Sequence, residues 1–196
     1  MKYVVSIGLL TLVLVGGGCF FKGENKDNQN TTPEIDRDAI LFEARENGLI
    51  MDEGEVARMT QIEVSADPTG SVAEPVDAYL KMDFKGWAAA ALADVTGGGS
   101  FGIARTRFLN GKFILVAELG NLPDPQLGYS YQGWLVRRGE QMDAVSAGIP
   151  VKTDKGNAIV YLSSQDFTAH DFFVLTLEPD DGNPSPAGHI LEGEIK

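Results

Sequence analysis

The sequence predicts an all-β protein of antiparallel strands that is preceded by a short helical segment. The clearest sign is Asn110-Gly111, a pair that favours a two-residue turn and stands between two apolar runs of strand character. From about Gln61 onward, further short apolar runs are separated by Pro, Gly, Asn and Asp. Many short strands with frequent turns and no intervening helices are typical of an antiparallel β-sandwich of the immunoglobulin-like type.

The helical segment is predicted to occupy residues 36–80 together with some extended chain. Asp36 is a suitable N-cap for a helix whose apolar residues share one face. Asp52 repeats the pattern, because Glu55 three residues later completes a capping box. We therefore expect two short helices before the strands begin.

The sandwich is predicted to fill residues 81–196. Residues 87–92 are rich in alanine and fit a helix or a strand, of which the strand is preferred. In the strand before the Asn110-Gly111 turn, Ala104 and Thr106 alternate with Arg105 and Arg107, so the small residues are expected to face a core and the arginines water. The other expected strands are Tyr129 to Arg137, Ala144 to Val151, Ala158 to Ser163, Phe172 to Leu177 and His189 to Ile195.

Cys19 is the only cysteine of the chain, and it ends an apolar run at the amino terminus. Lys2 precedes an apolar stretch from Val4 to Val15, and three glycines separate this stretch from Cys19. Small residues before a cysteine are typical of a bacterial lipoprotein signal peptide, here residues 1–18, and the cysteine that follows supplies a thiol that a diacylglycerol can alkylate. Lipoproteins mostly have Leu or Val where this chain has Gly16, so a plain cleaved signal and an uncleaved anchor remain alternatives.

Residues 19–35 are predicted to form a disordered tether. The stretch from Lys22 to Pro33 contains no apolar residue, so burial cannot offset its chain entropy. The formal net charge of the chain is -12, which disfavours nucleic acid as a partner and also disfavours anionic lipid. Membrane contact would therefore depend on the lipid at Cys19.

Several motifs resemble chemical sites, but their context does not support one. Residues 97–102 match G-x-G-x-x-G, yet a dinucleotide site requires a helix to follow, and here a strand is predicted. The two histidines, His170 and His189, lie in no zinc spacing, and no serine lies in a nucleophile motif. We therefore predict that the protein is not an enzyme and has no cofactor.

The acidic turn after the strand that ends near Leu177 has two interpretations. Its oxygens could bind a calcium ion, although the ligand spacing of an EF-hand is absent. Alternatively, these residue types serve turn geometry in a solvated loop, and the sequence then contains no metal site. The candidate ligands are Glu178, Asp180, Asp181 and Asn183.

A distributed pattern in the second half of the chain resembles a known family. The pattern runs through Leu122-Pro123, Tyr131 to Val136, Ser146 to Gly148, Val174 to Pro186 and Leu191 to Gly193. In this order the residues resemble the carboxy-terminal domain of anti-sigma-K factors, over about residues 92–196. The most specific parts are the strand around Trp134 and the Glu178-Pro179 strand end. The resemblance implies an extracytoplasmic β-sandwich.

The same resemblance does not carry over the regulatory act of the family. Members hold the sigma factor with a cytoplasmic helical domain, which a membrane span joins to the outer domain. Only Met1, Lys2 and Tyr3 precede the apolar run here, so we expect no cytoplasmic domain and no direct contact with a sigma factor.

Taken together, these observations predict a lipoprotein anchored through Cys19 to the extracytoplasmic face of the cell membrane. Its β-domain is expected to act as a protein-interaction or sensing module whose partner is another envelope protein. The alternative is an envelope lipoprotein that binds a small ligand, or calcium through the acidic loop.

Overall fold

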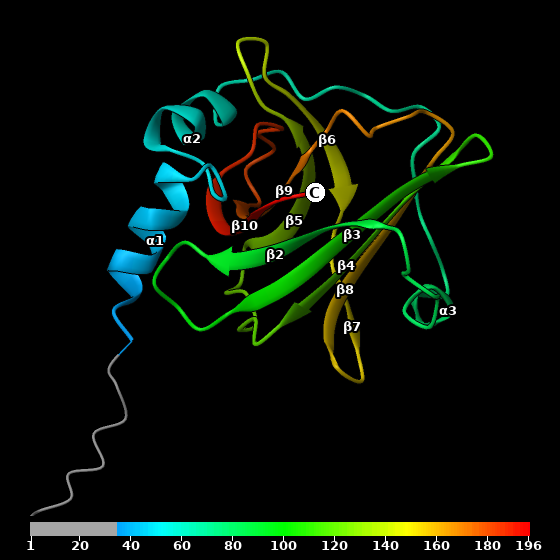
Figure 1. The fold of residues 1–196 in the computed structure, drawn as a ribbon, viewed down its shortest axis with the longest axis horizontal. Coiled ribbons are helices and arrows are strands. Elements are labelled where there is room, and N and C mark those ends of the chain that lie inside the picture. Colours follow the sequence, from blue (N-terminus) through cyan, green and yellow to red (C-terminus); the bar gives the residue numbers. More distant parts are fainter. Residues whose placement is uncertain (1–34) are drawn as a thin grey trace, which may run out of the picture. The chain divides into compact units, whose positions relative to one another are not determined.

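The computed structural model describes residues 35–196, of which Asp36–Lys196 form one compact unit (Figure 1). The predicted signal peptide, Cys19 and nearly all of the predicted tether lie outside the described residues. In the described part, no helix is long and apolar enough to span a membrane. The helices are α1 (Arg37–Glu46), α2 (Glu53–Met59) and α3 (Val76–Tyr79). The strands are β1 (Ser71–Val72), β2 (Ala88–Asp94), β3 (Phe101–Leu109), β4 (Lys112–Gly120), β5 (Tyr129–Arg137), β6 (Asp143–Gly148), β7 (Val151–Thr153), β8 (Gly156–Ser163), β9 (Phe172–Pro179) and β10 (Gly188–Glu194).

The two predicted helix starts are confirmed. The Asp36 side chain accepts a hydrogen bond from the Ala39 amide at 3.0 Å. Asp52 and Glu55 form the predicted capping box, in which each side chain accepts from the backbone amide of the other, at 2.8 and 3.1 Å. Such caps satisfy amides that would otherwise lack a partner at the start of a helix.

The predicted hairpin is also confirmed, as strands β3 and β4. Asn110 and Gly111 both have positive φ, at 53° and 72°, as a tight two-residue hairpin turn requires. Ala104 and Thr106 are buried as expected. Arg105 does not simply face water, because it pairs with Glu118 and its guanidinium lies 4.4 Å from the centre of the Phe84 ring.

All ten strands belong to one antiparallel sheet, so the all-β prediction is confirmed but the two sheets of an immunoglobulin-like sandwich are not found. The strand order is β1-β8-β4-β3-β2-β10-β9-β5-β6, and β7 also pairs with β8. Strand β2 pairs with both β3 and β10, and it thereby joins two groups of strands that a sandwich would keep apart.

Small residues allow the chain to bend at this junction. Strand β2 begins with four alanines, which leave its neighbours room to approach. Gly193 of β10 lies so close to β2 that an added Cβ would be 2.4 Å from the Ala91 carbonyl oxygen. Only glycine permits such an approach, so the sheet can curve here instead of separating into two.

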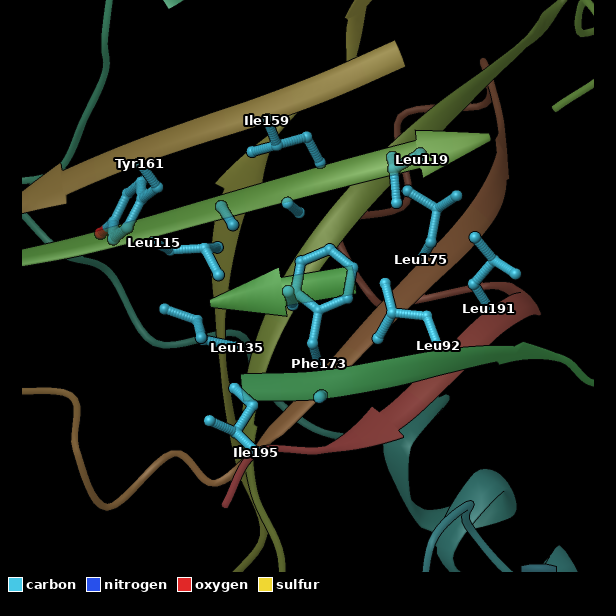
Figure 2. Packing of buried hydrophobic residues seen from close by; sticks show 14 of the residues in the cluster. Leu92, Leu115, Leu119, Leu135, Ile159, Tyr161, Phe173, Leu175, Leu191 and Ile195 are labelled. Carbon is cyan, nitrogen blue, oxygen red and sulfur yellow. The ribbon is translucent and has the colours of Figure 1, made fainter. Parts of the chain in front are cut away.

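The curved sheet encloses the main core, and its two ends approach each other. The Ser65 amide, in the chain before β1, donates to the Ala144 carbonyl oxygen of β6 at 2.9 Å. The sheet therefore resembles a nearly closed barrel. Figure 2 shows apolar side chains that fill its interior, among them Leu92, Leu115, Leu135, Ile159, Phe173, Leu175 and Leu191.

The strand predicted over residues 144–151 is wrong in one respect, because it is divided into β6 and β7. Gly148 has φ of 99°, a conformation that breaks the strand, and Pro150 follows it. The alanine-rich stretch, in contrast, is a strand as preferred, since it forms β2.

The residues before β2 cover the outside of the sheet. Met51 and Met59 pack with Trp134, Phe172 and Val174 in a second apolar cluster that includes side chains of β5, β6 and β9. A third cluster covers strands β4 and β8, and it includes Val76 of α3. Figure 1 shows α1 and α2 at one side of the sheet and α3 at the opposite side. The segment over residues 36–80 is thus integral to the compact unit.

Candidate functional site

The two most specific parts of the sequence resemblance meet at one hydrogen-bonded group. Trp134 of β5 is 4% exposed, and its Nε1 donates to the Thr176 hydroxyl of β9 at 2.8 Å. Thr176 is fully buried and donates to the Glu178 carboxylate, which also accepts from the Ala187 amide at 3.0 Å. One network therefore links two central strands to the loop that precedes β10.

A buried histidine and a buried carboxylate lie on β10. His189 Nδ1 lies 2.6 Å from Glu192 Oε1, and these side chains are 3% and 1% exposed. Residues three apart in a regular strand point to opposite faces. Here the pairing of β10 with β9 contains one extra residue between His189 and Leu191, and this irregularity brings both side chains to one side.

Glu192 also fixes the connection between α1 and α2. Its Oε2 accepts a hydrogen bond from the Met51 amide at 2.7 Å. Arg138, which follows β5, donates to the Gly48 carbonyl oxygen at 2.9 Å and pairs with Glu194 at 3.3 Å. We refer to the side chains that hold this connection to the sheet as the polar clamp, which consists of Arg138, His189, Glu192 and Glu194.

Within residues 35–196, the Nε2 atom of His189 has no hydrogen-bond partner. The other polar atoms of the pair bond to each other and to a backbone amide. Burial of a charge is costly unless it is paired, so the polar clamp stabilises one geometry of the α1–α2 connection. The Glu192 carboxylate already has hydrogen-bond partners on both oxygens, so the polar clamp positions the chain and leaves no free oxygen for other chemistry.

A second polar network fixes the chain that crosses between the two ends of the sheet. The Asp67 carboxylate accepts from the Tyr161 hydroxyl at 2.5 Å, from the Thr69 amide at 2.8 Å and from Gln165 Nε2 at 3.0 Å. Burial alone would raise the pKa of Asp67, but the hydroxyls and the amide that donate to its carboxylate lower it to about 2. Asp67 is therefore ionised at any physiological pH.

Tyr161→Phe is expected to lower the free energy of unfolding by about 1 to 2 kcal/mol at neutral pH, because it removes a donor to an ionised carboxylate. The folded-state pKa of Asp67, about 2, lies below the ordinary value of 3.8. A depressed pKa stabilises the fold above the ordinary value, and this contribution is lost as the pH falls through the folded-state value. The cost of the substitution, measured by urea unfolding, should therefore shrink between about pH 4 and pH 2.

Tyr131→Phe is the matched control for this prediction. The Tyr131 hydroxyl donates to the Pro123 carbonyl oxygen at 3.1 Å, and this acceptor does not titrate. Its cost should stay the same over the acid range. An equally constant cost for Tyr161→Phe would contradict the role assigned to Asp67.

The two histidines are buried beside carboxylates, a placement that sequence reasoning missed. His170 Nε2 lies 3.0 Å from Asp143 Oδ2, and burial lowers the pKa of His170 although Asp143 opposes this. His189 pairs with Glu192 only because of the irregularity in β10. The sequence contains no signal for that irregularity, since neither glycine nor proline stands at Ile190.

The acidic loop holds its candidate ligands in turn geometry. The Asn183 amide donates to the Asp181 carboxylate at 2.8 Å, and the Ser185 amide donates to the Asn183 side chain at 3.1 Å. Glu178 is engaged by Thr176 and Ala187, and Asp180 directly follows β9, where its amide donates to the Gly128 carbonyl oxygen at 2.8 Å. No group of three or more His, Cys, Asp or Glu in the described part of the chain is placed to hold a metal ion.

The glycine run is a loop that folds around a carboxylate. Asp94, the last residue of β2, accepts from the amides of Thr96 at 2.9 Å, Gly98 at 3.2 Å and Ser100 at 2.9 Å. These amides are the kind of donor that would bind a phosphate. The protein's own carboxylate uses them, and strand β3 follows, as the turn interpretation requires.

Comparison with known proteins supports the resemblance seen in the sequence. No curated protein and no solved structure matches the chain significantly. The family described as "Anti-sigma-K factor rskA, C-terminal" matches residues 10–190. This match extends beyond the strands to the helical segment and to part of the amino-terminal apolar run, and it includes Arg138 and His189 of the polar clamp but ends before Glu192. Because the family match covers most of the chain, the chain belongs to the anti-sigma-K factor C-terminal family.

Proposed function

We propose that the protein is a lipoprotein of the bacterial envelope whose anti-sigma-factor-like β-domain binds another envelope protein. The observation that carries this proposal is the family match together with the cysteine that follows an apolar run. Acylation of Cys19 would anchor the chain to the extracytoplasmic face of the membrane. A sigma factor acts in the cytoplasm, so a signal from this domain would pass through a partner that crosses the membrane.

Binding without catalysis fits the side chains of the site. His189 and Glu192 are almost inaccessible, and Glu178 accepts bonds from Thr176 and Ala187. A general base needs an open position where a substrate atom can approach it. These groups instead hold the helical segment and a loop against the sheet, which is what a rigid interaction module requires.

Cys19→Ser is expected to release the protein from membranes or to leave an unprocessed precursor, because serine has no thiol to acylate. Fractionation of cells and mass spectrometry of the mature amino terminus measure the two effects. The unsubstituted protein should carry acyl mass on Cys19, and Gly23→Ser should remain acylated in the membrane fraction. A mature protein that starts at another residue without acylation would contradict the anchor.

A further inference from the structure

Helix α1 is the element with the least burial support in the compact unit. Its sequence contains Ile40, Leu41 and Phe42, yet none of its residues is buried. Ile40 is 54% exposed and Phe42 is 65% exposed. Arg37 bonds to the Gly98 carbonyl oxygen, and the polar clamp fixes the chain after the helix. A helix of this length normally gains its stability from a buried apolar face, so α1 presents apolar side chains that nothing within residues 35–196 covers.

One side of α1 lines a groove of about 300 Å³. Opposite the helix stand strand β2, the loop that folds around Asp94, and Phe101 at the start of β3, which is 62% exposed. The lining is mainly apolar or backbone, and the hydrogen bonds of Asp94 fix the loop. We call this feature the α1 groove, lined by Arg37, Ile40, Leu41, Leu92, Ala93, Asp94 and residues 97–101.

The charges on α1 and its cap indicate the chemistry of an occupant. Asp36, Asp38, Glu43 and Glu46 outnumber the basic residues Arg37 and Arg45. Arg37 is already engaged by a carbonyl oxygen. The lining itself adds only Arg37 and Asp94 as charged groups, and both are bonded within the chain. The excess of acidic residues on the helix beside the groove repels a bilayer surface of anionic lipid, whereas it attracts a protein segment that carries Lys or Arg. Because the groove is lined by apolar side chains such as Ile40 and Leu41, its occupant should also carry an apolar side chain between its basic residues.

The position of α1 in the chain limits where the occupant can be. Cys19 precedes Ile35 by 16 residues. Whatever their conformation, sixteen residues span at most about 55 Å. If Cys19 is the anchor, as the proposed function states, Ile35 cannot lie farther than this from the membrane surface, and the α1 groove begins two residues later at Arg37. The segments that share this zone include the parts of membrane-spanning proteins that adjoin the bilayer.

We propose that the α1 groove binds the extracytoplasmic segment of a membrane-spanning partner, through an apolar side chain flanked by basic residues. This proposal rests on the proposed function and deepens it, because it assigns the surface and the kind of partner. The α1 groove would hold the partner's apolar side chain between Ile40 and Phe101. The acidic residues of α1 would face the partner's Lys or Arg.

The test uses the full-length lipoprotein in its native membranes. A photo-reactive phenylalanine analogue replaces Ile40 or Phe101 in the groove, or Phe42 or Asn110 outside it, and mass spectrometry identifies the adducts. We expect positions 40 and 101 to give an adduct with a membrane-spanning protein, at a segment rich in Lys or Arg. Ile40→Asp should reduce the adduct formed at position 101 at least tenfold, and 0.5 M salt should reduce it as well.

Phe42→Asp is the matched control, because Phe42 lies on the same helix with similar exposure but does not line the groove. It should change the adduct at position 101 less than twofold. Unchanged urea midpoints for Ile40→Asp and Phe42→Asp would show that both variants keep the fold. If Ile40→Asp does not fold, Phe101→Asp replaces it, and the probe is then placed at position 40.

Every other outcome overturns the proposal in a recognisable way. Adducts at positions 40 and 101 with lipid, with residues 1–34 of the same chain, with a second copy of this chain or with a sigma factor would each assign the α1 groove to a different occupant. A membrane-spanning partner captured only at position 42 or 110 would overturn the groove and leave the proposed function intact. If no position captures a protein, both the groove and the proposed function fail.

Discussion

Trp134→Ala is expected to lower the free energy of unfolding by about 3 to 5 kcal/mol, which is the cost of removing a large aromatic side chain from a packed core. Trp134 is 4% exposed and packs in the cluster that contains Met51, Met59 and Phe172. The change would also leave the buried Thr176 hydroxyl without its donor. Urea unfolding of the purified domain measures the effect.

Two further substitutions separate the causes. Trp134→Phe keeps an apolar ring but removes the donor to Thr176, so it should cost only about 1 to 2 kcal/mol. Trp87→Ala removes the other tryptophan, which is only half-buried, and should cost less than Trp134→Ala. A loss below about 1 kcal/mol for Trp134→Ala would show that this side chain does not support the cluster.

The residues of the family pattern include side chains that hold the fold together. Trp134 and Glu178 carry the most specific part of the resemblance, and Thr176 joins them by hydrogen bonds. Trp134 and Thr176 are buried, so the pattern marks how the strands and the loop before β10 are held together. A shared fold does not transfer a partner. Under the proposed function, we therefore expect specificity for a partner to depend on exposed positions such as Ile40.

Features that depend on neighbouring residues, such as helix caps and tight turns, were predicted well from the sequence. The caps at Asp36 and Asp52 and the turn at Asn110-Gly111 depend on a few neighbouring residues, and all three were found as expected. The extent of β5 also followed from its apolar run, and β9 begins at Phe172 as predicted, although it continues two residues beyond Leu177. Each of these features is decided within about ten residues of chain, where sequence pattern is most informative.

Long-range structure was less predictable for a physical reason. The pattern of a strand indicates which face is apolar but not which strand lies beside it. Whether β2 ends one sheet or joins two depends on the approach of Gly193 to Ala91, about a hundred residues away. The sandwich prediction therefore failed at the junction, although most of the individual strands were found where the sequence predicted them.

The candidate site was missed for the same reason. His189 and Glu192 should point to opposite faces at a spacing of three, and only the irregular pairing with β9 brings them together. The contact of Glu192 with the Met51 amide spans nearly the whole described chain. No pattern within β10 predicts a buried carboxylate that holds a connection between two distant helices.

Glu192→Ala is expected to cost about 3 to 5 kcal/mol, because it leaves His189 and the Met51 amide buried without their partner. Hydrogen exchange should also become faster at the Met51 amide and in the surrounding connection, since the polar clamp would be open there. The matched control is Glu194→Ala, whose side chain is 21% exposed and pairs with Arg138. That substitution should cost less than Glu192→Ala, because Arg138 keeps its bond to the Gly48 carbonyl oxygen and the Met51 amide keeps its acceptor.

A double-mutant cycle with His189 then decides whether the two side chains act as a pair. If Glu192 is needed because it satisfies His189, then His189→Leu combined with Glu192→Leu should cost at least 1 kcal/mol less than the sum of the two single substitutions. The combined change replaces a buried polar pair by apolar groups, which removes the burial penalty together with the interaction. The Met51 amide still loses its acceptor, so faster exchange at Met51 should persist in the double variant. Additive costs would show that His189 and Glu192 are independent, and unchanged exchange at Met51 would show that the polar clamp does not hold the α1–α2 connection.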